Sequence, residues 1–262
     1  MNSQDVKNAI SGVLVVDKPV GMTSHDVVEA IRRGTGIRRA GHTGTLDPRA
    51  SGVLVILVGP AVRLSEYVSA SDKRYQAIIR LGSSTDTFDA DGKFVRSDQP
   101  VNVTEEQFET ILKQFEGEIE QTPPPYSAVK VQGRRAYDMA RQGEEVELAP
   151  RKIQVHHLEV LEWAPPEVVV DVHCSSGTYV RSLANDMGNA LGTGAYLVEV
   201  LRVIAATLRE QGGDALIASD LKKAAMTRVF GFEILPAPFV VAHLQLGLLL
   251  HRLGAPLSAK GN

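Results

Sequence analysis

Residues 41–54 read GHTGTLDPRASGVL and combine three glycines and a proline with several hydroxyl side chains. Glycine lets the backbone adopt positive φ and approach a ligand closely, while Pro48 restricts Asp47 to extended conformations. The apolar run that begins at Val53 predicts a buried strand. We therefore predict a stiff loop over residues 41–52, with a single carboxylate, Asp47, held in front of that strand.

Two other interpretations of this loop use the same residues. In a surface turn, Asp47 would hydrogen-bond its own backbone, as aspartate often does before proline. In a nucleotide-binding loop the glycines would cradle phosphates, but the spacing G-x-x-x-x-G-K-[ST] and its lysine are absent. The residues alone leave a turn and a catalytic loop open, and they disfavour an NTPase.

Strands and helices are mixed around this loop. Alternating apolar residues over 73–81 indicate a half-buried strand of an antiparallel sheet. Capping-box spacings begin two helices at Thr23 and Thr104, which we expect to be ended by Gly34 and Gly117. Because the elements do not alternate as in a doubly wound fold, the sequence predicts class α+β. Further strands are expected at 12–17, from 53, at 153–163, 168–174 and 196–205, and further helices at 134–141 and from about 179.

The composition is that of an ordinary globular protein. The 262 residues are 44% hydrophobic and 23% charged, with a net charge of −3, which excludes a disordered chain, a collagen and a coiled-coil rod. The single cysteine, Cys174, and the absence of a metal-ligand spacing among the histidines predict neither a disulfide framework nor a metal.

Two apolar signals bear on localisation. The polar start of the chain lacks the apolar core of a signal peptide, so we expect a cytoplasmic protein. Residues 234–250 are apolar but interrupted by Pro236 and Pro238, so we interpret them as a packed tail rather than a membrane span.

Basic residues gather in one segment although the net charge is negative. Residues 32–49 hold five arginines and one acid. Basic pairs also occur at 73–74, 134–135 and 151–152. A basic face of this kind fits the phosphate backbone of a nucleic acid. Taken alone, however, the charges are explained more simply by scattered, solvated arginines.

The loop, with GVLVVDKPVGMTS before it, resembles the signature of the TruB family, the tRNA pseudouridine-55 synthases. Further similar blocks are KRYQAIIRLGSSTDTFDADG, PPPYSAVKVQGRRAYDMARQG and CSSGTYVRSLANDMG. The resemblance implies the family's fold, a mixed and largely antiparallel sheet with flanking helices. It implies an isomerase that flips a uridine out of the T-loop of tRNA, cleaves its N-glycosidic bond, rotates the base and rejoins it through carbon. It also implies no cofactor and no metal, with the T-arm stem-loop of tRNA as partner of a monomer.

The same resemblance assigns catalytic roles. Asp47 matches the family's catalytic aspartate, which acts as a nucleophile or a base. Tyr75 matches a tyrosine expected to stack under the target base, and Arg181 matches the arginine that pairs with the aspartate. Burial raises the pKa of a carboxyl group, and a guanidinium opposes that shift. Base stacking returns about 1–3 kcal/mol of the cost of flipping.

Other matched residues are expected to bind substrate. His42 fills or props the space left by the displaced base, and Tyr179 lines the pocket. Lys18 is expected to be structural or phosphate-facing. The pocket-lining leucine of the family falls on Val200 in ungapped register, or on Leu201 if one insertion is allowed.

The chain departs from the family's pattern towards its end. Tyr196 stands where the family has a histidine. Too few residues remain after about Ser219 for the family's PUA domain, a barrel that grips tRNA. We expect a catalytic domain over residues 10–210 and a C-terminal extension over 211–262, with at most a truncated PUA-like remnant.

Two alternative activities would use the same tRNA-binding surface as a pseudouridine synthase. The chain could be a tRNA-binding folding chaperone with weak or no catalysis, in which case folding assistance would survive the loss of Asp47. It could also be a glycosylase, which would release free uracil.

Overall fold

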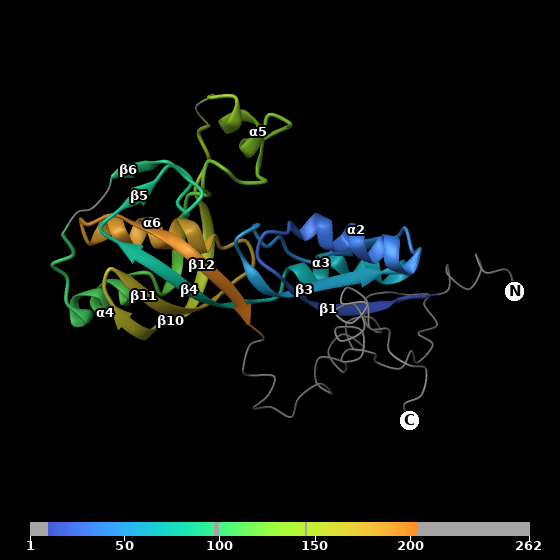
Figure 1. The fold of residues 1–262 in the computed structure, drawn as a ribbon, viewed down its shortest axis with the longest axis horizontal. Helices are drawn as coiled ribbons and strands as arrows, with labels where there is room; N and C mark the ends of the chain where they lie inside the picture. The colour runs from blue at the N-terminus through green and yellow to red at the C-terminus, as the bar shows by residue number, and fades with distance from the viewer. Residues whose placement is uncertain (1–9, 97–99, 145, 204–262) are drawn as a thin grey trace, which may run out of the picture. The chain divides into compact units, whose positions relative to one another are not determined.

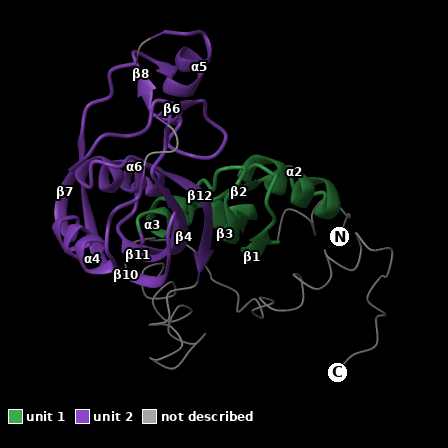
Figure 2. Ribbon diagram, turned by 60° about the vertical axis from the view of Figure 1, so that its left-hand side comes forward, with its two compact units in different colours: residues 1–70, 204–262 green, residues 71–203 purple. Residues whose placement is uncertain are grey.

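The computed structural model describes residues 10–96, 100–144 and 146–203. The chain divides into two compact units, one of residues 1–70 and 204–262 and one of residues 71–203 (Figure 2). The first unit contains β1 (Gly12–Lys18), α2 (Ser24–Thr35), β2 (Ala40–His42), β3 (Ser51–Val58), the 3-10 helix η1 (Gly59–Leu64) and α3 (Ser65–Ser69). The second contains β4 (Lys73–Leu81), β5 (Ser84–Thr85), β6 (Phe94–Arg96), α4 (Glu105–Gln114), β7 (Gly117–Gln121), β8 (Lys130–Val131), β9 (Arg134–Arg135), α5 (Ala136–Arg141), β10 (Arg151–Ala164), β11 (Glu167–Cys174), α6 (Val180–Ala190) and β12 (Ala195–Val203).

In the first unit, β3 pairs antiparallel with both β1 and β2. The β1–β3 register runs from Gly12 opposite Val58 to Lys18 opposite Gly52. Helix α2 packs on β2 (Figure 2). Helix α2 buries Val27, Val28 and Ile31 together with Ser24. In β3, buried residues alternate with half-buried ones as far as Val55, and the last three residues of the strand are buried. The core of this unit includes Val27, Val28, Ile31, Leu54, Ile56 and Leu57.

Helix α2 begins as its sequence predicts. The Thr23 side chain accepts a hydrogen bond from the Asp26 N–H, and the Asp26 carboxylate accepts one from the Thr23 N–H, which forms the capping box. The expected end at Gly34 is wrong by two residues. Gly36 takes the left-handed conformation, with φ of 70°, and its N–H donates to the carbonyl of Arg32.

In the second unit the strands follow the order β12–β4–β11–β10–β7, each antiparallel to its neighbour. Helix α6 packs on β12 and β4, and α4 packs on β10 and α6 (Figure 1). The antiparallel sheet with helices beside it confirms the predicted α+β class. The core includes Ala77, Ile79, Leu81, Phe108, Leu112, Val170, Val172, Leu183 and Met187.

Two features of this unit differ from the sequence prediction. Strand β7 was not expected, because only Ile119 interrupts its polar residues; it is held by pairing with β10 along one side. Residues 134 and 135, expected in a helix, instead form β9, which pairs with β8 before α5 begins.

Several expectations fall outside the described residues. They are the end of the last strand beyond residue 203, the boundary at 210, the PUA-like remnant and the apolar stretch 234–250. Within the described ranges, the helices all fall short of the length and apolar character that crossing a membrane requires.

Candidate active site

Lys18 braces the loop that carries Asp47. Its side chain is fully buried at the end of β1. The Nζ atom donates to the carbonyls of Met22 at 2.7 Å, Pro19 at 2.9 Å and Pro48 at 3.4 Å. Burial lowers the pKa of Lys18, and the negative charges of Asp47 and, less strongly, Asp26 oppose that shift. Of the two roles expected for Lys18, the geometry supports the structural one.

Two further contacts fix the same loop against α2 and the turn before it. The Ser24 hydroxyl donates to the Leu46 carbonyl at 3.0 Å and accepts from the Leu46 N–H at 2.8 Å. The Gly21 N–H, at a residue with φ of 89°, donates to the Pro48 carbonyl at 2.8 Å. Each residue that flanks Asp47 in the chain is therefore tied to the region between β1 and α2.

Asp47 itself lies in a turn and is half-buried. Its carbonyl accepts from the Ala50 N–H at 3.0 Å, which closes the turn just before β3. The backbone thus forms a turn that is held by hydrogen bonds on both sides of Asp47, while the role of the carboxylate stays a prediction. A turn with several buried braces can present a carboxylate in a fixed position.

His42 lies at the end of β2, opposite Ile56 of β3 and close to the same loop in sequence. Burial lowers the pKa of His42, and the neighbouring charge of His25 acts in the same direction. A neutral imidazole at this position fits the expected role of filling space better than a role in binding phosphate.

Tyr75 lies in β4 of the second unit and is half-buried. It is opposite Val172 of β11 and Arg202 of β12. Directly opposed residues share one face of an antiparallel sheet. Tyr75 therefore lies on the face that also carries Ala77 and Ile79, which are both buried.

The same register distinguishes the two candidates for the pocket-lining position. Val200 lies opposite Ala77 and Leu201 opposite Gln76. Val200, which is buried, shares the face of Tyr75, whereas Leu201 is 37% exposed and lies on the other face. A bulge between Leu197 and Glu199 provides the extra residue in this strand. The bulge is one extra residue, which is what would move the family's leucine to Leu201, so the choice between Val200 and Leu201 stays a prediction.

Tyr179 marks the start of α6, where Gln121 clamps its backbone. The buried amide of Gln121 accepts from the Tyr179 N–H at 2.8 Å and donates to the Tyr179 carbonyl at 3.1 Å. The Ser182 hydroxyl donates to the Thr122 carbonyl at 2.8 Å. These contacts fix the first turn of α6 to the end of β7. Arg181 lies in this turn, between Tyr179 and Ser182, and is positioned by them.

Arg181 is buried and forms an ion pair with Asp89, a residue that the sequence analysis missed. Its Nη1 atom lies 3.2 Å from Asp89 Oδ2 and donates to the Thr87 carbonyl at 3.2 Å, while Nη2 donates to the Tyr126 carbonyl at 3.3 Å. The two side chains are only 7% and 15% exposed. A guanidinium held by three acceptors has a fixed direction.

The loop of Asp89 is ordered by its own hydrogen bonds. Asp89 Oδ1 accepts from the Thr87 hydroxyl at 2.6 Å and from the Asp91 N–H at 3.1 Å. The Thr85 hydroxyl donates to the Asp89 carbonyl at 2.7 Å. A signal for this loop was present in the stretch DTFDADG, where aspartate and threonine can cap their own turn, but nothing local identified Arg181 as the partner.

The expected pairing of Asp47 with Arg181 joins residues of different units and stays a prediction.

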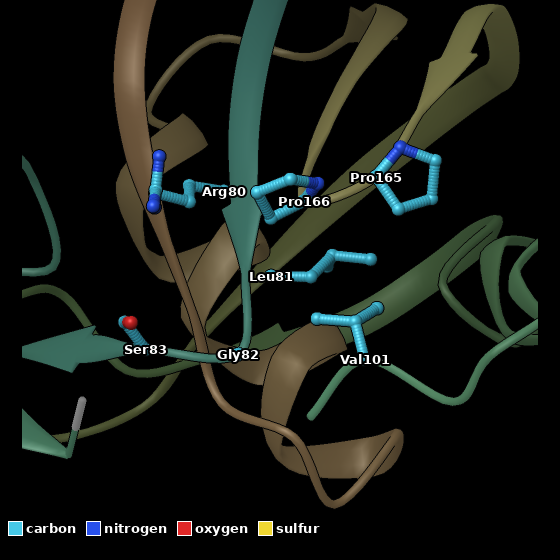
Figure 3. Close-up of a pocket in the computed structure, with 7 residues that line it drawn as sticks. All are labelled: Arg80, Leu81, Gly82, Ser83, Val101, Pro165 and Pro166. Carbon is cyan, nitrogen blue, oxygen red and sulfur yellow. The ribbon is translucent and has the colours of Figure 1, made fainter. Parts of the chain in front are cut away.

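Elsewhere in the second unit, a pocket of about 320 Å³ lies between the end of β4 and the β10–β11 turn (Figure 3). Its lining includes Leu81, Val101 and Pro166 but none of the predicted site residues. The pocket is therefore not the predicted site.

The expected basic residues differ in their surroundings. Arg33, Arg38 and Arg39 are exposed. By contrast, Arg134 pairs with Glu144 and Lys152 with Glu118, both at 2.8 Å. The exposed arginines of the first unit are therefore the better candidates for phosphate contacts than the basic pairs of the second.

Comparison with known proteins gives a family match. The sequence model of the TruB family pseudouridylate synthases (N-terminal domain) matches residues 32–180. Among curated relatives named tRNA pseudouridine synthase B, the protein of Symbiobacterium thermophilum is 48% identical over 76% of this chain and 67% of its own length. That of Serratia proteamaculans is 45% identical over 76% and 63%, and that of Thiobacillus denitrificans is 42% identical over 91% and 78%.

Solved structures agree with this match. A chain in a Cbf5–Nop10–Gar1 complex is 32% identical with a TM-score of 0.59, over 78% of this chain and 51% of its own. A chain in an H/ACA RNP bound to a substrate RNA containing 2′-deoxyuridine is 30% identical with a TM-score of 0.55, over 78% and 50%. This chain thus spans about half of those proteins, and 67%, 63% and 78% of the three curated relatives. It belongs to the TruB family of pseudouridylate synthases.

Proposed function

We propose that this chain converts uridine to pseudouridine in tRNA, at position 55 of the T-loop. The observation that carries the proposal is the family match over residues 32–180, which includes the braced Asp47 loop. The relatives' shared name, tRNA pseudouridine synthase B, supports tRNA as the substrate. The enzyme acts as a cytoplasmic monomer.

In the proposed mechanism the target uridine leaves its stack, which costs a few kcal/mol. Tyr75 stacks on the extruded base and returns about 1–3 kcal/mol of that cost. Exposed arginines of the first unit hold the phosphates. Tyr179 and His42, with either Val200 or Leu201, line the space around the base.

Asp47 then starts the cleavage of the N-glycosidic bond, as a nucleophile or as a base. Arg181 keeps the carboxylate ionised and holds it in place. Asp89 is a positioning residue, because it directs the guanidinium of Arg181. The base turns and rejoins the ribose through carbon. Side chains alone supply these steps.

The test uses an unmodified T-loop stem-loop RNA and detects the modified base by carbodiimide treatment and primer extension. We expect product with the parent protein and none with Asp47→Asn. Asp17→Asn is the matched control, because Asp17 is exposed on β1 of the same unit, and it should modify the RNA at the parent rate. Modification at the parent rate by Asp47→Asn would refute the role of Asp47, and release of free uracil would indicate a glycosylase instead.

A further inference from the structure

Three side chains that the proposed reaction does not use meet in the second unit. They are Asp72, His156 and His173, and their donor atoms all lie within 4.8 Å of one another. His156 Nε2 is 3.1 Å from Asp72 Oδ2. The rings of His156 and His173 are 4.8 Å apart between centroids.

The strand register explains how residues so far apart in the chain come together. Asp72 directly precedes β4, and β4 pairs with β11 so that Lys73 lies opposite Cys174. Strand β10 pairs with the other side of β11, with a register shift between Val155 and His157. The residue at that bulge is His156, and a bulge redirects a side chain. His156 thereby reaches His173 and Asp72 at one end of three adjacent strands.

We propose that Asp72, His156 and His173 bind a divalent transition-metal ion, for which Zn²⁺ is the best candidate. Two imidazoles and a carboxylate are a common donor set for Zn²⁺, with a water as the fourth ligand. Tetrahedral Zn²⁺ with bonds of about 2.0–2.1 Å places its ligand atoms about 3.3 Å apart. The 3.1 Å separation of Asp72 Oδ2 and His156 Nε2 already matches this spacing, and the donor atom of His173, within 4.8 Å of both, has to move closer to bind the same ion.

The electrostatic surroundings agree with this site. The guanidinium of Arg74, which precedes Tyr75 in β4, forms an ion pair with Asp171, with Nε 2.8 Å from Oδ1. Its positive charge is therefore balanced by a carboxylate other than Asp72.

The site is separate from the residues assigned to catalysis. His173 alternates with Val172 along β11, and Val172 is the register partner of Tyr75. The side chains of His173 and Tyr75 thus lie on opposite faces of the sheet. A bound ion would tie the start of β4 to β10 and β11, which makes it a structural site. This departs from our sequence-based expectation of a chain without metal.

The test is calorimetric titration of Zn²⁺ into the untagged full-length protein in a buffer without chelators. We expect one ion per chain, and a rise in Tm when Zn²⁺ is present. His156→Ala should weaken binding at least about tenfold, since losing even an outer partner of a metal site costs that much, and it should abolish the rise in Tm.

His157→Ala is the matched control. His157 is the next residue of the same strand, is more exposed than His156, and pairs with Glu116 at 3.1 Å outside the cluster. It should bind Zn²⁺ as the parent does. Absence of Zn²⁺ binding by the parent, or equal loss in the two variants, would overturn the proposal and leave the cluster as an ion pair beside a second histidine. The His156 and His157 side chains are 33% and 55% exposed, and circular dichroism of each variant is to be compared with that of the parent to check that it folds.

Discussion

Replacing Asp89 by asparagine removes one negative charge beside Arg181 and keeps the shape of the side chain. The pair is nearly buried, with side-chain exposures of 7% and 15%. Removing one partner of a buried ion pair costs about 3–5 kcal/mol, because the other charge is left uncompensated. The carbonyls of Thr87 and Tyr126 still accept from Arg181, so we expect the lower end, about 3 kcal/mol.

The assay is urea unfolding of the full chain, with Glu167→Gln as the control. Glu167 pairs with Arg80 in the same unit at 3.3 Å, but its side chain is 48% exposed. An exposed pair contributes less than about 1 kcal/mol. The control variant should therefore unfold almost as the parent does.

The kinetic consequence follows from the position of Arg181. If Asp89 directs the guanidinium towards the reacting carboxylate, the variant should lose kcat by about tenfold or more, since 1.4 kcal/mol corresponds to one decade, while KM changes little. A merely structural ion pair would lower stability and leave kcat intact. Equal unfolding free energies for Asp89→Asn and Glu167→Gln, with the parent kcat in both, would refute the reasoning.

Three further predictions concern single residues. Lys18→Met leaves buried carbonyls without their donor, so the free energy of unfolding in urea should fall by about 1–3 kcal/mol. Pseudouridine formation should also drop, because the Asp47 loop loosens. Full activity at parent stability would contradict the role of Lys18 in holding this loop. A Cβ at Gly92 would collide with the Thr87 hydroxyl, which donates to Asp89, the partner of Arg181. Gly92→Ala should therefore disturb Arg181 and lower kcat, while RNA affinity, measured by filter binding, stays unchanged. Burial lowers the pKa of Lys73 from 10.5 to about 8, so between these values the unfolded chain holds more protons and stability rises with pH. The free energy of unfolding of the parent, relative to that of Lys73→Met, should rise by about 1 kcal/mol from about pH 7.5 to about pH 9. A difference that does not vary with pH would count against the lowered pKa.

Elements with local signals could be predicted almost to the residue. The capping boxes at Thr23 and Thr104 fix where α2 and α4 begin, because each box joins residues three apart. The end of α2 could not be predicted as closely, because two glycines, Gly34 and Gly36, can each stop a helix. Only the full structure shows which one takes the left-handed conformation.

Elements held by distant partners could not be predicted in this way. Strand β7 is largely polar and exists because it pairs with β10, so its own residues carry little strand signal. The same holds for the ion pair of Asp89 with Arg181, which are 92 residues apart. Motif resemblance identified Arg181 and predicts Asp47 as its partner, a pairing that stays a prediction, but it did not indicate the contact with Asp89, because a motif identifies residue types and not all of their contacts.

Lys18 shows most clearly where the sequence reaches its limit. A lysine at the end of a strand is normally expected in solvent, because burying an ammonium group is costly. Here three carbonyls surround Nζ, one of them from Pro48, 30 residues further along the chain. The cost of burial is met only if that loop folds back on β1, so the lysine and the loop stabilise each other. An arginine at this position would carry the same charge, but its planar fork would not match three carbonyls grouped around one atom. We therefore expect Lys18→Arg to loosen the Asp47 loop although the charge is conserved.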